Sequence, residues 1–290
     1  MAKKEVKEAE VKEIKEEPVV DASVDVTEHD EVKLDVEKDV ITDIPVSEET
    51  ATKAELSSDV SAWTPKTALG KKVKDGEIKD IDAILDESFC IMEAEIVDAL
   101  LPGMEHELLM IGQSKGKFGG GQRRVFRQTQ RKTPEGNCPS FGCIAVIGDK
   151  NGHVGVGHGK SKDTVPAREK AIRKARINIM KIRRGCGAWD CGCRTPHSIP
   201  FAITGKCGSV RIQLMPAPKG KGLVVEKEVA KILKLAGIKD VRSRIFGQSR
   251  TTINLIDACI DALNNLNRMK INQKMADNVG LIEGGVKKDE

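Results

Sequence analysis

The sequence predicts an α+β fold in which two small domains follow a disordered acidic extension. Three observations lead to this prediction. Charge is segregated between an acidic N-terminal stretch and a basic remainder, although the 290-residue chain has a formal net charge of only +4. Two successive patterns of short strands and helices follow, each of the size of a small domain. The chain is long enough to give each of them a core.

The N-terminal stretch is strongly acidic. Residues 1–60 carry 8 basic and 19 acidic side chains, a net charge of −11, and no aromatic residue precedes Trp63. A segment of this composition buries too little apolar surface to offset the entropy lost on ordering. We therefore expect residues 1–75 to form a disordered acidic extension. Residues 76–120 are expected to hold an N-terminal helical segment that ends near Pro102, followed by a basic loop leading into the body.

The first domain is expected over residues 121–186. Its expected strands are 122–132, 140–148 and 153–159, and the sequence Asp-Lys-Asn-Gly at 149–152 is a hairpin-turn signal. A helix is expected over 165–182, because apolar residues recur there at helical spacing. The expected apolar side consists of Val165, Ile172, Ala175, Ile179 and Ile182. The resulting order is β-β-β-α, a small sheet with a helix across one face.

The second domain is expected over residues 197–270, after a cysteine-rich connector at 187–196. Residues 271–290 are expected to be a loose tail. The expected elements of the domain are strands at 197–203 and 209–214, a helix at 226–236, a strand at 240–245 and a helix at 251–269. This order is ββαβα.

Basic residues cluster in the middle of the chain. Residues 111–220 carry 22 basic and 5 acidic side chains, a net charge of +17, and the basic runs flank glycine-rich turns without acidic partners. This pattern favours contact with nucleic-acid phosphates over an ordinary solvated surface. With 3% aromatic residues and no Tyr, stacking on single-stranded bases is not expected. The candidate RNA contacts from this reasoning are Lys115, Lys117, Arg123, Arg124, Arg127, Lys160, Lys162, Arg183, Arg184, Lys219 and Lys221.

The segment VGVGHGKS at 154–161 is similar to a phosphate-binding P-loop, but it fails the pattern by one residue. Val154 stands where the P-loop needs its first glycine. We therefore expect no nucleotide site there. The simpler interpretation is a strand whose glycines allow close backbone approach. No nucleophile or clustered carboxylates suggest catalysis, so the chain is not expected to be an enzyme.

Five potential metal ligands lie within 22 positions, in the spacing C-x4-C-x-C-x3-H-x9-C. In a chain from a reducing compartment such a group suggests metal rather than disulfides. The first interpretation is one structural zinc, held by four cysteines or by three of them with the histidine. The second is a set of small free thiols, and both stay open. The candidate ligands are Cys186, Cys191, Cys193, His197 and Cys207. No other cofactor is expected.

Membrane insertion and secretion are not expected. No apolar run approaches the roughly eighteen residues of a membrane span, and the N-terminus lacks the apolar core of a signal peptide. A cytoplasmic protein without a membrane partner is therefore expected.

Two long segments resemble a ribosomal protein family. The segment FGCIAVIGDKNGHVGVGHGKSKDTVPAREKAIRKARINIMKI resembles the first domain of the universal small-subunit family called S-five. The segments PHSIPFAITGKCGSVRIQLMPAPKGKGLV and LAGIKDVRSRIFGQSRTTINLIDA resemble its second domain. The match covers about residues 121–266, and the stretch RRGCGAWDCGC resembles the archaeal and eukaryote-like branch. The acidic extension has no counterpart in this resemblance.

The resemblance implies a first domain like those that bind double-stranded RNA. It also implies a structural constituent of the small ribosomal subunit, near the path by which messenger RNA enters and beside the fourth and eighth proteins of that subunit. A contribution to assembly and to decoding accuracy in translation is expected. The contacts to ribosomal RNA that it implies are Arg123, Arg124, Arg127, Lys150, Asn151, Gly152, His153 and Lys160. The alternatives are a free-standing double-stranded-RNA-binding regulator and an RNA-handling enzyme.

Overall fold

The computed structural model describes residues 63–114 and 123–285. Most of the expected acidic extension, residues 1–62, lies outside the described residues. Part of the expected basic loop, including Lys115 and Lys117, lies outside them too.

Three short helices form the first part of the described chain: α2 (Ala68–Lys74), α3 (Ile81–Asp86) and α4 (Glu95–Leu100). They bury a small core that includes Ile84, Ile96 and Val97. The indole of Trp63 donates a hydrogen bond of 2.9 Å to Glu93, and the hydroxyl of Thr67 caps α2. The predicted disorder is therefore wrong for residues 63–75. Composition alone did not predict the capped helix α2 in this segment.

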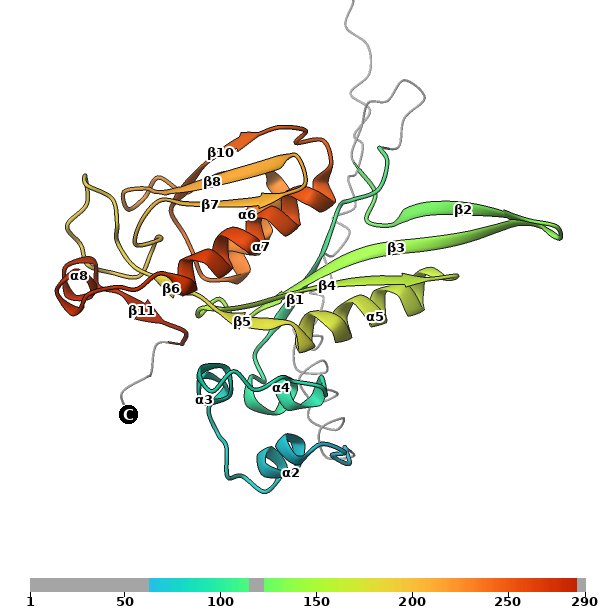
Figure 1. The fold of residues 1–290 in the computed structure, drawn as a ribbon, viewed down its shortest axis with the longest axis horizontal. Coiled ribbons are helices and arrows are strands. Elements are labelled where there is room, and N and C mark those ends of the chain that lie inside the picture. Colours follow the sequence, from blue (N-terminus) through green and yellow to red (C-terminus); the bar gives the residue numbers. More distant parts are fainter. Residues whose placement is uncertain (1–62, 115–122, 286–290) are drawn as a thin grey trace, which may run out of the picture. The chain divides into compact units, whose positions relative to one another are not determined.

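The first sheet is built around one long strand, β3 (Gly136–Gly148) (Figure 1). Strand β1 (Glu105–Leu109) pairs with its C-terminal half, and β2 (Arg127–Thr133) pairs with its N-terminal half. On the other side, β3 pairs with β4 (His153–Ser161), and β4 pairs with the short β5 (Ile179–Lys181). The hairpin of β2 and β3 projects past the end of β4. The 122–132 strand therefore begins later than predicted, at Arg127.

Helix α5 (Thr164–Ile177) lies across this sheet at very close range. It buries three alanines, Ala167, Ala171 and Ala175, against alternate glycines of β4. A Cβ atom on Gly157 would lie 2.3 Å from the carbonyl oxygen of Ala171. The structure confirms the expected role of these glycines in close backbone approach. The predicted apolar side is confirmed for Ala175 and Ile172, which pack inward. It is wrong for Val165, which is exposed, and for Ile179 and Ile182, which lie beyond the helix.

The second sheet has the order β7-β8-β10-β9, and helices α6 and α7 contribute to its core. Its elements are β7 (Ile203–Cys207), β8 (Val210–Pro216), β9 (Leu223–Val224), α6 (Lys227–Leu235), β10 (Val241–Phe246) and α7 (Thr252–Arg268). The predicted strand at 197–203 is wrong, because regular pairing begins only at Ile203. Residues 197–202 instead follow the cysteine-rich connector, with one isolated bridge between Ser198 and Gly185.

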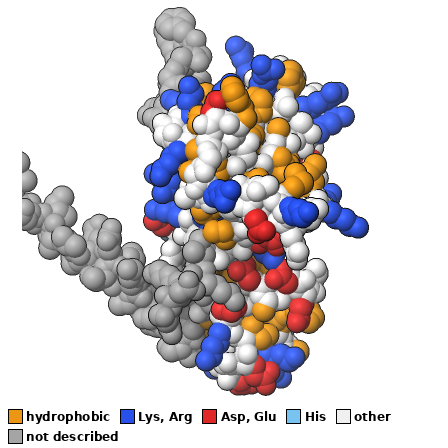
Figure 2. Space-filling view, turned by 90° about the vertical axis from the view of Figure 1, so that its left-hand side faces the viewer, with side chains coloured by type: hydrophobic (Ala, Val, Ile, Leu, Met, Phe, Trp, Pro, Cys, Tyr) orange, Lys and Arg blue, Asp and Glu red, His pale blue; other side chains and the backbone are white. Residues whose placement is uncertain are grey.

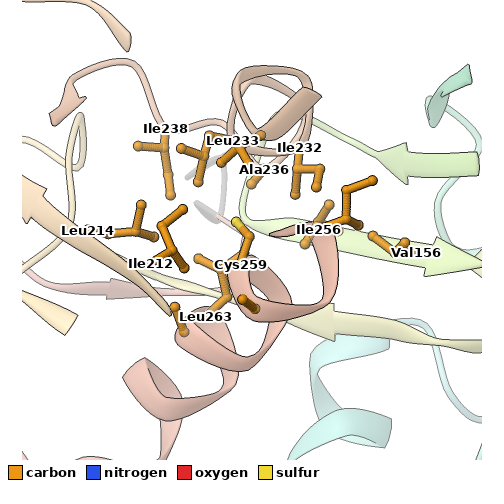
Figure 3. Packing of buried hydrophobic residues seen from close by; sticks show 14 of the residues in the cluster. Val156, Ile212, Leu214, Ile232, Leu233, Ala236, Ile238, Ile256, Cys259 and Leu263 are labelled. Atoms are coloured by element: carbon orange, nitrogen blue, oxygen red, sulfur yellow. The ribbon is translucent and has the colours of Figure 1, made fainter. Parts of the chain in front are cut away.

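One large apolar core joins the two sheets. Ile212 and Leu214 of β8 pack with residues of α6 and α7, and Val156 of β4 reaches the same cluster (Figure 3). The two domains therefore share buried apolar surface. Among the described residues, no helix combines the length and apolar character that a membrane span requires.

The last part of the chain is folded up to residue 285, contrary to the predicted loose tail. Helix α8 (Gln273–Val279) is followed by β11 (Ile282–Glu283), which pairs with β6 (Arg183–Arg184). The sequence of this segment is polar and short of aromatic residues. Its order depends on contacts with residues about 100 positions earlier, which local sequence patterns do not reveal.

Candidate nucleic-acid interface

The projecting β2–β3 hairpin carries a group of exposed basic side chains. Four exposed basic residues lie on β2 or just before it: Arg124, Arg127, Arg131 and Lys132. None of them takes part in an ion pair within the described ranges 63–114 and 123–285. Arg123, by contrast, is half-buried, and its guanidinium donates to the carbonyl oxygen of Arg250 at 3.4 Å. The hairpin thus offers exposed cations suited to phosphate oxygens.

Strand register places two of the predicted contacts in one row. Arg127 pairs with Gly142 of β3, and Gly142 pairs with Lys160 of β4. Residues paired across neighbouring strands point to the same face of a sheet. Arg127 and Lys160 therefore flank a glycine, and a Cβ atom built there would meet no atom closer than 3.8 Å.

Four predicted contacts belong instead to an internal network around the β3–β4 turn. His153 is only 3% exposed, and its ring bridges Asp149 at 2.6 Å and Asp82 of α3 at 2.9 Å. The guanidinium of Arg184, which is also buried, donates to the backbone and side-chain oxygens of Asn151 at 2.8 and 3.0 Å. Gly152 is buried with φ 103°, a conformation that favours glycine. Within the chain, Asn151, Gly152, His153 and Arg184 thus hold the turn together, and their predicted RNA contacts stay predictions.

The two carboxylates change the titration of His153. Burial lowers its pKa, but hydrogen bonds and charges from Asp149 and Asp82 outweigh burial, and the pKa rises above its ordinary value of 6.5. Burial likewise raises the pKa of Asp149, but the bond with His153 and two backbone donors bring it below the ordinary 3.8. Between pH 3.8 and pH 6.5 both groups of the pair are therefore charged in the folded protein.

The other predicted contacts differ in their availability. Lys162, Lys219 and Lys221 are exposed. Lys150 is exposed but forms an ion pair with Glu105. Arg183 pairs with Glu283 at 2.7 Å, and its guanidinium also donates to the carbonyl oxygen of Met269. Arg183 is therefore engaged in fixing the C-terminal segment.

Sequence reasoning missed basic residues of the second sheet. They are exposed and lie on neighbouring strands: Lys206, Arg211, Arg242 and Arg244. Lys206 pairs directly with Arg211 across β7 and β8. The alternation of arginine with half-buried residues in VRSRIF at 241–246 was the available signal, because alternate residues of a strand share a face. Figure 2 shows one side of the molecule, where Lys and Arg side chains are widely spread above a group of acidic ones.

The connector brings four of the five predicted metal ligands together. Cys186, Cys191, Cys193 and His197, here called the Cys–His cluster, have ligand atoms that all lie within 4.8 Å of one another. Cys207 is not part of this group and packs from β7 against the large core. The cluster could hold a metal ion, and the ligand set with Cys207 is not supported by the structure.

Comparison with known proteins identifies the family. Models of the domains described as "Ribosomal protein S5, N-terminal domain" and "Ribosomal protein S5, C-terminal domain" match residues 122–183 and 205–277. The chain is 48% identical over 227 residues to the small ribosomal subunit protein uS5 of Nanoarchaeum equitans, covering 78% of this chain and 97% of that protein. The chain belongs to the uS5 family.

Other archaeal members of the family agree with this assignment. The uS5 protein of Methanocaldococcus jannaschii is 45% identical over 78% of this chain and 98% of its own length. That of Methanosphaera stadtmanae is 45% identical over 77% of this chain and 92% of its own length. The family resemblance inferred from the sequence is therefore confirmed. Because uS5 proteins are structural rather than catalytic, the chain is not an enzyme.

Proposed function

We propose that this protein is a structural constituent of the small ribosomal subunit in the cytoplasm and binds ribosomal RNA there. Family membership over more than three quarters of the chain carries the proposal. The physical support is the projecting β2–β3 hairpin, whose exposed cations have no acidic partners within the described ranges. Cations of this kind bind the RNA backbone without reading its sequence.

The finer proposal concerns its place in the subunit. We infer from the family resemblance a position near the path by which messenger RNA enters, beside the fourth and eighth proteins, with a contribution to assembly and decoding accuracy. A double-stranded-RNA-binding-like first domain is consistent with a helix on one face of a sheet and a basic hairpin beside it. A metal at the Cys–His cluster would serve the fold, because the cluster offers four protein ligands.

Sedimentation of the tagged full-length protein from a lysate of its own organism tests the role. Co-migration with small subunits, retained after a high-salt wash, is the expected result. The alternative, a free-standing double-stranded-RNA-binding regulator, predicts a pool that stays at the top of the gradient. Recovery of the protein only in that pool would refute the ribosomal proposal.

A further inference from the structure

We propose that the Cys–His cluster holds one structural zinc ion, which fixes the connector between the two domains and the C-terminal segment docked on it. The proposal concerns the fold and does not depend on the ribosomal role. The cluster provides three sulfur atoms and one imidazole nitrogen, which is one of the ligand sets of structural zinc sites.

The spacing of the ligand atoms suits a tetrahedral ion. With a Zn–S bond of about 2.3 Å, two sulfur ligands of one tetrahedral zinc lie about 3.8 Å apart. The Sγ atom of Cys191 lies 3.9 Å from Nε2 of His197, and no pair in the cluster exceeds 4.8 Å. The atoms would therefore need to move together by about 1 Å at most, which is within the reach of side-chain rotation.

The histidine is already oriented for this task. Nδ1 of His197 is hydrogen-bonded to Asp240 at 2.8 Å, and both side chains are buried. The other oxygen of Asp240 accepts from the backbone N–H of Gly222 at 2.8 Å. A metal-binding histidine commonly has its second nitrogen bound by a carboxylate, which fixes the tautomer and aims the free nitrogen at the metal. Nε2 accordingly lies beside the sulfur atom of Cys191.

The connector has no regular secondary structure to hold it in place. Residues 187–196 contain no helix or strand, and Trp189, their largest apolar side chain, is 95% exposed. The described hydrogen bonds within the loop are few, such as that from Cys191 N–H to Ala188 O at 3.2 Å. A bound zinc can supply the missing free energy, because binding to a site that forms only on folding adds directly to stability.

The C-terminal segment rests on this loop. The backbone N–H of Cys186 donates to the carbonyl oxygen of Val279, the last residue of helix α8, at 2.8 Å. A Cβ on Gly280 would lie 1.9 Å from the carbonyl oxygen of Arg194, so the two backbones are in close contact. Removal of the metal should consequently release residues 273–285 as well as the connector.

Native mass spectrometry of the full-length protein, purified without added metal, is the first test. One zinc per chain is expected, and Cys191→Ser should lose it. The matched control is Cys207→Ser, which alters a cysteine outside the cluster and should keep the zinc. His197→Cys should retain the metal with four sulfur ligands. A wild-type chain that neither carries zinc nor binds it on titration overturns the proposal, as does a disulfide within the cluster or loss of zinc from Cys207→Ser.

Two measurements on the wild-type chain avoid the risk that a variant fails to fold. Replacement of the metal by Co²⁺ should give the visible absorption of a tetrahedral site with thiolate ligands. Chelation should lower the melting temperature and raise hydrogen exchange in residues 187–196 and 273–285. An unchanged melting temperature and exchange after metal removal would refute the structural role. Neither readout needs RNA, so failure here is distinct from failure of the ribosomal proposal.

Discussion

Replacement of Gly157 by alanine should force helix α5 away from the first sheet. A Cβ at this position would lie 2.3 Å from both the carbonyl oxygen of Ala171 and the amide nitrogen of Ala175. Ordinary contact begins at 3.4 Å, so the helix backbone must shift by about 1 Å. The colliding atoms are backbone, which cannot rotate away as a flexible side chain does.

The expected loss can be estimated from overpacking in other cores, which costs about 1–3 kcal/mol. In a chain of this size each kcal/mol lowers the melting temperature by about 2–4 °C. The matched control is Gly142→Ala in the neighbouring strand β3. There the nearest atom to a new Cβ is the carbonyl oxygen of Gly159, at 3.8 Å. Both substitutions restrict the unfolded chain to a similar degree, so the difference between the two variants isolates the collision.

Thermal unfolding of the two full-length variants, followed by circular dichroism, measures this difference. Gly157→Ala should melt clearly below the wild type, and Gly142→Ala should melt at or slightly above it. Equal melting temperatures would mean that α5 adjusts freely and that the glycines of β4 do not set its distance. The interpretation of VGVGHGKS as a packing surface would then fail.

Three further predictions concern charge. Replacing Arg124, Arg127 and Arg131 by alanine should weaken RNA binding equally across sequences. It should also reduce the slope of log affinity against log salt concentration by roughly 0.7–0.9 per lost contact. A triple alanine variant of Lys71, Lys72 and Lys79 is the control and should show neither effect in filter binding at several salt concentrations. Arg184→Leu should leave that salt slope unchanged. It should lower the free energy of unfolding by about 1–3 kcal/mol, because the carbonyl oxygens of Asn151 and Gly284 lose their hydrogen-bond donor. A urea unfolding midpoint equal to that of the wild type would contradict this. Folding raises the pKa of His153, so the stability that His153 adds to the fold is complete below pH 6.5 and is lost as pH rises through the pKa of the folded state. Folding lowers the pKa of Asp149, so the stability that Asp149 adds is present above pH 3.8 and is lost as pH falls through its lowered pKa. Melting temperatures measured at a series of pH values should therefore fall above pH 6.5 in the wild type. The His153→Gln variant should not show this fall.

Local sequence signals predicted the elements whose pattern is self-contained. The turn at 149–152 and the amphipathic helices α6 and α7 lie where their residues indicate. The sequence predicts helix α5 but not its full buried face, because α5 packs alanine against glycine, and hydrophobic periodicity gives little weight to either. Its real end, before Ile179, depends on the pairing of β5 with β4.

Charge alone could not separate binding residues from structural ones. Arg124 and Arg184 look alike in the sequence, but only the fold shows that Arg184 is enclosed by Asn151 and Gly284. The partner of His153 at Asp82 is equally hidden, since 71 residues separate them. The spacing of cysteine and histidine indicated five candidate ligands, and only the fold shows that four of them lie together and that Cys207, on β7, lies elsewhere.

Strand β3 has two halves with different surroundings. Residues 144–148 are held between β1 and β4 and are buried, whereas residues 136–140 pair with β2 alone and lie beyond the end of β4. Backbone amides of the first group should exchange only when the whole domain unfolds, and those of the second by local fraying. A single continuous strand thus joins a rigid base to an adaptable arm. The arm can follow the contour of a bound nucleic acid while the sheet from which it extends keeps its geometry.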